Sequence, residues 1–191
     1  MTRDLIRDLT AAFVDHPETI RAEAQEGEDA TAYFMLKGHD DDESKLVGTG
    51  GSHVDALAFL IAAIGVANEW TYTFRLLTKG LPRETPKREQ RNAISYDPEP
   101  ARLLLVRILH ALDFTGYEVA VSPGAGARDS LTFAFTIRPG NSDDNAVLRV
   151  PHEIELRDRT LRMALIDAIG TLFRAVARRG GVRFHVVVDA P

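Results

Sequence analysis

The 191-residue chain contains no cysteine, which excludes disulfide frameworks, thiolate metal sites and cysteine nucleophiles. Aromatic residues are scarce, at 7%, so a core must consist mainly of Leu, Ile, Val and Ala. The opening residues lack the apolar segment of a signal peptide. The most apolar run, Ala56 to Ala67, is shorter than the ~20 residues that cross a bilayer. We therefore expect a cytoplasmic protein without a membrane partner.

The net charge of −5 is unevenly distributed along the chain. Residues 1–78 hold 6 Lys/Arg and 14 Asp/Glu, a net −8, whereas residues 79–101 and 102–191 carry +1 and +2. Phosphate contacts dominate the affinity of most nucleic-acid binders. An acidic first part therefore disfavours that class unless its charges are segregated.

The first 78 residues alternate between helical and strand patterns. Apolar residues at three- and four-residue spacing predict two amphipathic helices, and β-branched and aromatic alternation predicts strands. Ser52 is a candidate N-cap of the second main helix, with Asp55 at the third helical position. The sequence EGED supplies a glycine for a hairpin turn. The expected elements are a helix over 3–14, strands over 20–25 and 30–37, a short helix from the HDDDES sequence, a helix over 52–65, and a strand over 69–77.

Residues 79–101 contain four prolines and little apolar periodicity, so they are interpreted as a linker. Arg83, Lys87, Arg88 and Arg91 make its middle basic, and basic disordered segments can order on RNA. Two interpretations remain open for this segment, a solvated connector and an RNA-contacting arm.

The pattern then repeats in residues 102–191. A helix over 102–112, strands over 117–122 and 131–138, a long helix capped by Asp158 and a strand over 182–189 are expected. Two similar six-residue sequences, LIAAIG at Leu60–Gly65 and LIDAIG at Leu165–Gly170, lie 105 positions apart. Repeated element order together with this match predicts an internal duplication.

The strongest local signal is the sequence KLVGTGGSHVDAL, which begins at Lys45. A helix ends in aliphatic residues, a GxxG turn follows at Gly48–Gly51, and a new helix begins at once. Two glycines allow a tight turn and leave no side chain between the backbone and a ligand. The amides at the start of the next helix can then meet a sugar–phosphate backbone.

This arrangement resembles the type II KH domain of the small bacterial KhpA (YlqC) family over residues 1–78. The resemblance implies an α+β fold of tandem type II KH-like modules, with a second module that shares the element order but lacks GxxG. It implies single-stranded RNA as the partner, no catalysis and no cofactor, and assembly as a dimer or with a second KH protein. The positions carried over are Gly48, Thr49, Gly50, Gly51, Lys45 and Ser52.

The turn departs from the family pattern because it contains no positive side chain. Only Lys45 and His53 could add charge nearby, and Asp40, Asp41, Asp42 and Glu43 precede it. In the second module an offset of 105 places Glu153-Ile154-Glu155-Leu156 at the turn. This module is therefore interpreted as degenerate, with a structural or dimer-mimicking role. The long helix is nevertheless flanked by arginines, which form a solvated face or an auxiliary RNA surface: Arg157, Arg159, Arg162, Arg174, Arg178 and Arg179.

The pattern bears on three classes of function. RNA binding through the N-terminal turn is the leading hypothesis. The alternative is a protein-interaction or dimerisation scaffold that kept the KH fold and lost its ligand, which the −8 charge of the first module favours. An enzyme finds no support, because Ser52, His53 and Asp55 lie too close along one helix start for a triad. The six histidines form no i, i+4 ligand pair and the Asp40–Asp42 run lacks calcium-loop spacing, so no metal is expected.

Overall fold

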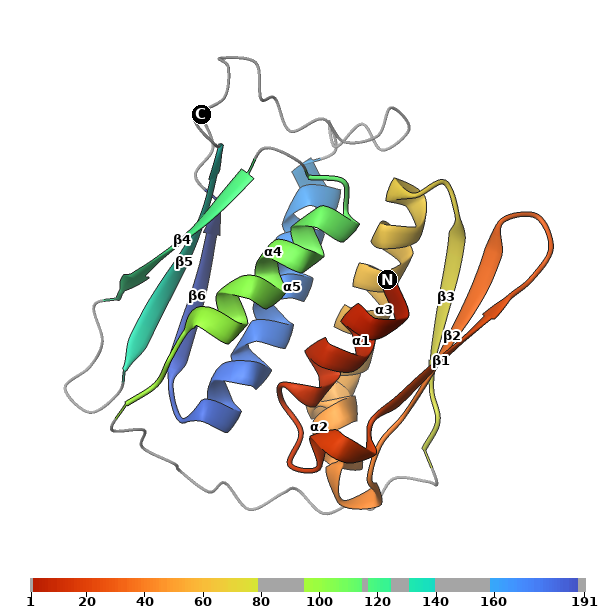
Figure 1. Ribbon diagram of the computed structural model, residues 1–191, viewed down its shortest axis with the longest axis horizontal. Coiled ribbons are helices and arrows are strands. Elements are labelled where there is room, and N and C mark those ends of the chain that lie inside the picture. The colour runs from red at the N-terminus through yellow and green to blue at the C-terminus, as the bar shows by residue number, and fades with distance from the viewer. Residues whose placement is uncertain (1, 79–94, 115–116, 125–130, 140–158, 189–191) are drawn as a thin grey trace.

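The chain is a mixed α+β protein with two three-stranded sheets. The computed structural model in Figure 1 describes residues 2–78, 95–114, 117–124, 131–139 and 159–188, with residues 139 and 159–162 described by their backbone alone. The elements in order are α1 (Thr2–Ala11), η1 (Pro17–Thr19), β1 (Arg21–Glu26), β2 (Thr31–Lys37), η2 (Asp40–Asp42), α2 (Glu43–Val47), η3 (Thr49–Gly51), α3 (Ser52–Ala67), β3 (Thr71–Leu76), α4 (Glu99–Ala111), β4 (Tyr117–Pro123), β5 (Thr132–Pro139), α5 (Arg159–Gly180) and β6 (Arg183–Val188).

The first sheet has the order β1-β2-β3. β1 and β2 form an antiparallel hairpin, and β3 lies parallel to β2 after the connection through α2 and α3. The alternation predicted for the second strand is confirmed, because Ala32, Phe34 and Leu36 are buried while Tyr33 is exposed. This strand therefore buries one face against the helices.

The hairpin turn contains the predicted glycine, but its positive φ angles fall on two other residues. Asp29 and Ala30 adopt positive φ angles of 54° and 52°. Gly27 instead donates its amide to the Thr31 carbonyl at 2.9 Å, and a Cβ on it would meet Thr31 Oγ1 at 2.5 Å. The glycine is needed here for close approach rather than for its φ angle.

α3 is apolar on nearly all sides, which is typical of a helix buried on two faces. Its buried residues include Leu57, Ile61 and Ile64 on one stripe and also Ala56, Leu60 and Gly65. One face packs on the first sheet and another on α5. The segment Thr49–Ala67 is long and apolar enough to cross a membrane by length and composition alone. Its position between the sheet and α5 accounts for that composition.

The second half repeats the first, as the element order predicted. Its sheet has the order β4-β5-β6, with an antiparallel pair followed by a parallel pair. α4 begins at Glu99, three residues before the expected start at residue 102. The sequence pattern places Pro100 in the linker, but proline is tolerated in the first turn of a helix, where its missing amide is no loss.

Equivalent main-chain hydrogen bonds fix the register between the halves. The Trp70 amide donates to the Gly65 carbonyl at 2.8 Å, and the Val182 amide donates to the Ala177 carbonyl at 3.0 Å. The offset between α3 and α5 is therefore 112 residues. Burial follows this offset, since residues 53–62 and 165–174 have the same order of buried, intermediate and exposed positions.

The six-residue match that suggested the duplication is thus out of register. Leu60–Gly65 and Leu165–Gly170 are related by an offset of 105, which differs from the structural offset by two turns of helix. The two halves share one sheet topology, but this six-residue match does not follow the register between them.

The helices of the two halves face each other between the sheets (Figure 1). α3 packs on α5 in the opposite direction, and α1 packs on α4. One apolar cluster contains buried residues of both halves. Asn68 Nδ2 donates to the Ala111 carbonyl at 3.0 Å, and Arg179 Nη1 donates to the Ala11 carbonyl at 2.8 Å. Arg107 Nη1 also donates to Asp8 Oδ2 at 2.8 Å, on an exposed edge between α4 and α1. The first two interactions have a similar role in the two halves. Each of these two satisfies the last turn of a helix in the other half.

Candidate nucleic-acid interface

The glycine turn between α2 and α3 has three left-handed backbone positions. Gly48 has φ 75° and ψ 172°, Gly50 has φ 62° and ψ 22°, and Gly51 has φ 88° and ψ 3°. The combination at Gly48 belongs to a region that is essentially restricted to glycine. The sequence prediction of a tight glycine turn at this place is confirmed.

Gly48 is enclosed on its inner side. A Cβ on Gly48 would lie 2.6 Å from Cγ of His53 and 2.8 Å from Oγ of Ser52. The outer side of the turn is bare, because a Cβ on Gly50 would meet no atom within 4 Å and both Thr49 and Gly50 are exposed. A ligand could therefore approach the backbone of the turn from solvent.

α3 starts without a side-chain cap. Its N-cap is Gly51, and Ser52 is the first helical residue rather than the cap that the sequence suggested. The reason is the left-handed φ of Gly51, which turns the chain into the helix one residue earlier. The first amides of α3 donate no hydrogen bond to an N-cap side chain, and the positive end of the helix dipole lies beside the exposed turn.

His53 lies beneath the turn rather than on its surface. The residue is 8% exposed, its ring packs against Phe13 with centroids 5.5 Å apart, and its Nδ1 lies 2.6 Å from the Lys45 carbonyl. Burial lowers the pKa of His53, and the nearby Arg178 and Arg174 lower it further, although the bond to Lys45 opposes them. The neutral ring therefore acts as a support between α2 and α3.

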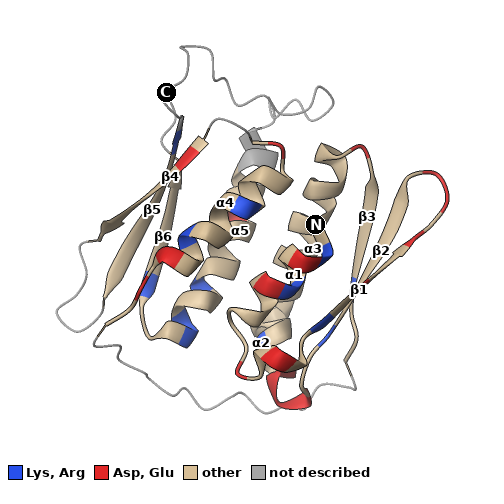
Figure 2. Cartoon of the chain, in the orientation of Figure 1, with Lys and Arg blue, Asp and Glu red and all other residues tan. Residues whose placement is uncertain are grey.

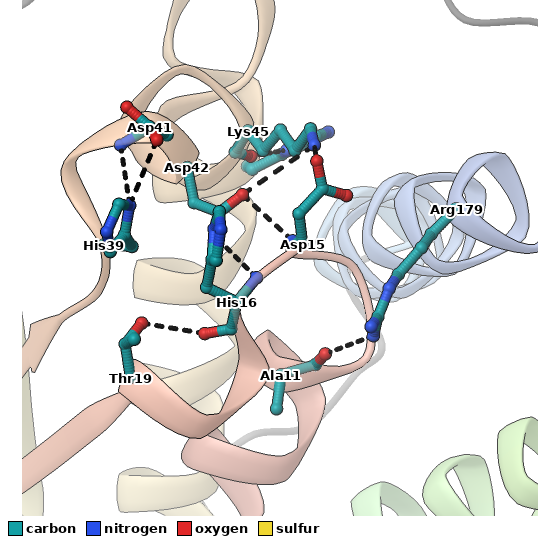
Figure 3. A network of polar contacts seen from close by, with 10 residues as sticks. Ala11, Asp15, His16, Thr19, His39, Asp41, Asp42, Lys45 and Arg179 are labelled. Carbon is teal, nitrogen blue, oxygen red and sulfur yellow. Dashed lines mark hydrogen bonds and ion pairs between the residues drawn. The ribbon is translucent and has the colours of Figure 1, made fainter.

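Lys45 is also engaged within the first half (Figure 3). Its Nζ pairs with the carboxylate of Asp15 and lies 3.7 Å from Oδ1 of Asp42. Asp42 is 1% exposed and accepts hydrogen bonds from the amides of Asp15 at 2.9 Å and His16 at 2.8 Å. Burial alone would raise the pKa of Asp42, but these bonds and Lys45 lower it.

The acidic run before the turn is only partly exposed. Asp42 and Glu43 are buried, whereas Asp40 and Asp41 face solvent. Asp55 is the carboxylate nearest the second glycine, with Oδ2 3.6 Å from the position of a Cβ on Gly51. The run therefore places fewer free charges at the turn than its composition implies.

Two arginines of the second half place positive charge at the end of the molecule where the glycine turn lies. Arg174 and Arg178 are exposed and separated by one helical turn on α5, and both act on His53 electrostatically. Figure 2 shows basic positions on the half of α5 that ends at the same end of the molecule as the turn. Arg174 Nη2 donates to Thr171 Oγ1 at 2.8 Å, and Arg179 is held by Ala11 at the interface between the halves.

This juxtaposition could not be predicted from the sequence. The arginines are recognisable as a basic helix end, but their position at the same end of the molecule as the glycine turn depends on the antiparallel packing of α3 and α5. The equivalence of Arg174 and Arg178 to Ala62 and Val66 likewise follows only from the main-chain bonds of the structure.

The second half has a continuous helix where the first half has the glycine turn. Residues 153–156, which the offset of 105 proposed as the counterpart, lie outside the described residues, as do Arg157, Asp158 and the basic linker positions 83–91. The structural offset of 112 places the counterpart at residues 160–163, within α5. α5 is accordingly longer than α3, at 22 residues against 16.

Comparison with known proteins does not assign this chain to a family. No protein-family model, no curated protein and no solved structure matches the chain.

Proposed function

We propose that the chain binds single-stranded RNA at the turn Gly48–Gly51 of a KH-like first half, and that it is not an enzyme. The observation that carries this proposal is the bare, solvent-facing turn, in which exposed backbone leads directly into the uncapped start of α3. The element order of the first half is the one that the resemblance to type II KH domains implies. The second half is then a degenerate KH-like module that takes the place of a partner subunit.

The chemistry of the turn suits a sugar–phosphate backbone. Backbone amides and a helix N-terminus favour an anion, and the absence of side chains at Gly50 and Gly51 permits close approach. Lys45 and His53 contribute by holding the shape of the turn, since one is paired and the other is buried. RNA contact is assigned to Gly48, Thr49, Gly50, Gly51 and Ser52.

The cations of this interface come from α5. Because the turn lacks a positive side chain, we assign phosphate neutralisation to Arg174 and Arg178, which are exposed on α5 and act electrostatically on His53 beneath the turn. This assignment explains how a first half with a net charge of −8 could still bind a polyanion. Acidic and basic groups alternate on α1, where Arg7 pairs with Asp4 and Asp8, whereas the last part of α5 carries basic groups, as Figure 2 illustrates.

A protein-interaction scaffold is the second candidate function. The observation that favours it is the neutralisation of Lys45 by Asp15 and Asp42, together with Asp55 near the turn. Such a protein would keep the fold and the turn without nucleic-acid affinity.

Fluorescence anisotropy with labelled single-stranded oligoribonucleotides separates these functions. The double variant Thr49→Asp/Gly50→Asp adds two negative charges on the exposed face of the turn. The matched control Ala62→Asp/Val66→Asp adds two charges at exposed positions on the far part of α3. RNA binding predicts affinity for the parent and the control, with loss only in the turn variant.

Equal behaviour of the turn variant and the parent, with or without affinity, would contradict the proposal and favour the scaffold. Circular dichroism of each variant confirms that the helices are retained.

A further inference from the structure

The loop after α1 and the loop after β2 bring two histidines together. His16 precedes η1 and His39 precedes η2, and their ring centroids lie 4.3 Å apart. Asp41 is the third member of this cluster. One ligand atom from each of the three residues lies within 4.8 Å of the others. The cluster is visible at the edge of the polar network in Figure 3.

The orientation of His16 is fixed from below by a carboxylate. Nδ1 of His16 lies 3.1 Å from Oδ2 of the buried Asp42, whose other oxygen accepts the amide of Asp15. The ring therefore keeps Nε2 for another partner. A carboxylate behind the non-coordinating nitrogen is the usual outer shell of a metal-binding histidine, because it fixes the tautomer and raises the basicity of the ligand.

A ring nitrogen of His39 and a carboxylate oxygen of Asp41 lie close together. Nδ1 of His39 accepts a hydrogen bond from the Asp41 amide at 3.3 Å, so this nitrogen carries a lone pair. Oδ2 of the Asp41 carboxylate lies only 3.5 Å from the same nitrogen. A cation that binds both atoms must replace the long hydrogen bond from the Asp41 amide, because the ring nitrogen has one lone pair.

We infer that His16, His39 and Asp41 form a binding site for a divalent transition-metal ion of the zinc class. Two imidazoles and one carboxylate suit Zn²⁺, Co²⁺ or Ni²⁺, whereas Mg²⁺ and Ca²⁺ prefer shells of oxygen. Three protein ligands leave a fourth position for water. This inference is independent of RNA binding.

The ligands can reach bonding distance with side-chain rotation alone. A tetrahedral ion with bonds of ~2.0 Å holds its ligand atoms ~3.3 Å apart, so the cluster must contract by roughly 1.5 Å at its widest separation. The side chains of His16 and His39 are 40% and 42% exposed and that of Asp41 is 77% exposed. Rotamer changes of the exposed His39 and Asp41 supply this movement, while Asp42 holds the ring of His16 in place.

Calorimetric titration of the full chain with ZnCl₂ at neutral pH tests the site. One ion per chain is expected, and His39→Asn should weaken binding by more than the roughly 10- to 100-fold that loss of an outer-shell partner costs. The control variants His110→Asn and His185→Asn change exposed histidines on α4 and β6 and should bind like the parent.

A second readout needs no variant. In NMR spectra of the unaltered chain, Zn²⁺ should shift the imidazole signals of His16 and His39 and leave those of His110 and His185 unchanged, and Mg²⁺ should shift none of the four. Absence of zinc uptake by the parent, equal affinity of His39→Asn, or shifts at all four histidines alike would overturn the inference.

Discussion

Nδ1 of His53 lies 2.6 Å from the carbonyl oxygen of Lys45, so one side chain of α3 fastens the end of α2 beneath the glycine turn. A carbonyl oxygen only accepts hydrogen bonds, and Nδ1 must therefore carry the proton of the neutral ring. The shape of the turn thus depends on a buried histidine that stays uncharged.

Stability should decrease as the pH falls below the ordinary histidine pKa of 6.5, because of His53. Its pKa is lowered in the folded state, chiefly by burial, so the unfolded chain binds the proton first. Above pH 6.5 neither state is protonated and His53 adds no dependence. Between that value and the lower folded pKa, the free energy of unfolding decreases by up to about 1.4 kcal/mol per pH unit.

The variant His53→Leu, which carries the residue found at the equivalent position 165, should flatten this slope in urea unfolding between about pH 7 and 5. The variant His110→Gln, at an exposed position of α4, should retain it. An unchanged slope in His53→Leu would contradict the buried, neutral state of the ring.

Two glycines of the turn should differ in their tolerance of alanine. Gly48→Ala places a Cβ against His53 at 2.6 Å in a backbone region restricted to glycine, and we expect a loss above about 2 kcal/mol in the free energy of unfolding. Gly50→Ala enters open space and should cost only about 1–2 kcal/mol for its left-handed φ. Denaturant unfolding measures both, and equal losses would mean that His53 does not close the turn.

The salt dependence of RNA affinity should depend on α5. For single-stranded RNA, each phosphate that a protein neutralises adds about 0.7 to the steepness of log affinity against log salt. Arg174→Ala/Arg178→Ala should therefore weaken binding and reduce the slope by up to about 1.4. Arg138→Ala removes an exposed arginine of β5 that lies 3.6 Å from Glu118 and should leave the slope intact. If the α5 variant kept the salt dependence of the parent, these arginines would not be part of the RNA interface.

The shared core should make the two halves unfold together. Trp70 is the single tryptophan of the chain and reports on the first half, whereas Leu172 is fully buried on α5. Leu172→Ala should cost about 2–5 kcal/mol and shift the unfolding transition followed by Trp70 fluorescence. His185→Gln, an exposed change in β6, should not. An unshifted Trp70 transition in Leu172→Ala would show that the halves unfold independently.

Local patterns predicted most of the elements. Alternation identified the buried face of β2, and the glycine spacing identified the turn, because both depend on neighbours along the chain. The apolar composition of α3 indicates burial on more than one face, but the sequence does not show that α5 is the element that covers Ala56 and Leu60. The predicted cap at Ser52 is wrong for a local reason, the left-handed conformation of Gly51.

The features of the candidate sites that the sequence does not predict depend on tertiary structure. Arg178 approaches His53 only because α3 and α5 run in opposite directions. The similar six-residue sequences that begin at Leu60 and Leu165 suggest a register between these helices that is two turns away from the actual one. His16 and His39 are 23 positions apart, and their meeting depends on Asp42, which fixes the loop after α1. No spacing rule for metal ligands contains this pair.

The most direct measurement of the RNA-binding account is a chemical-shift titration of the ¹⁵N-labelled full chain with an unlabelled single-stranded oligoribonucleotide. The account predicts that amide signals from Gly48 to His53 move together with those of Arg174 and Arg178, while the outer strand β1 stays unchanged. Saturation of the chain with RNA without a shift at the glycine turn, or shifts confined to residues far from it, would contradict the account.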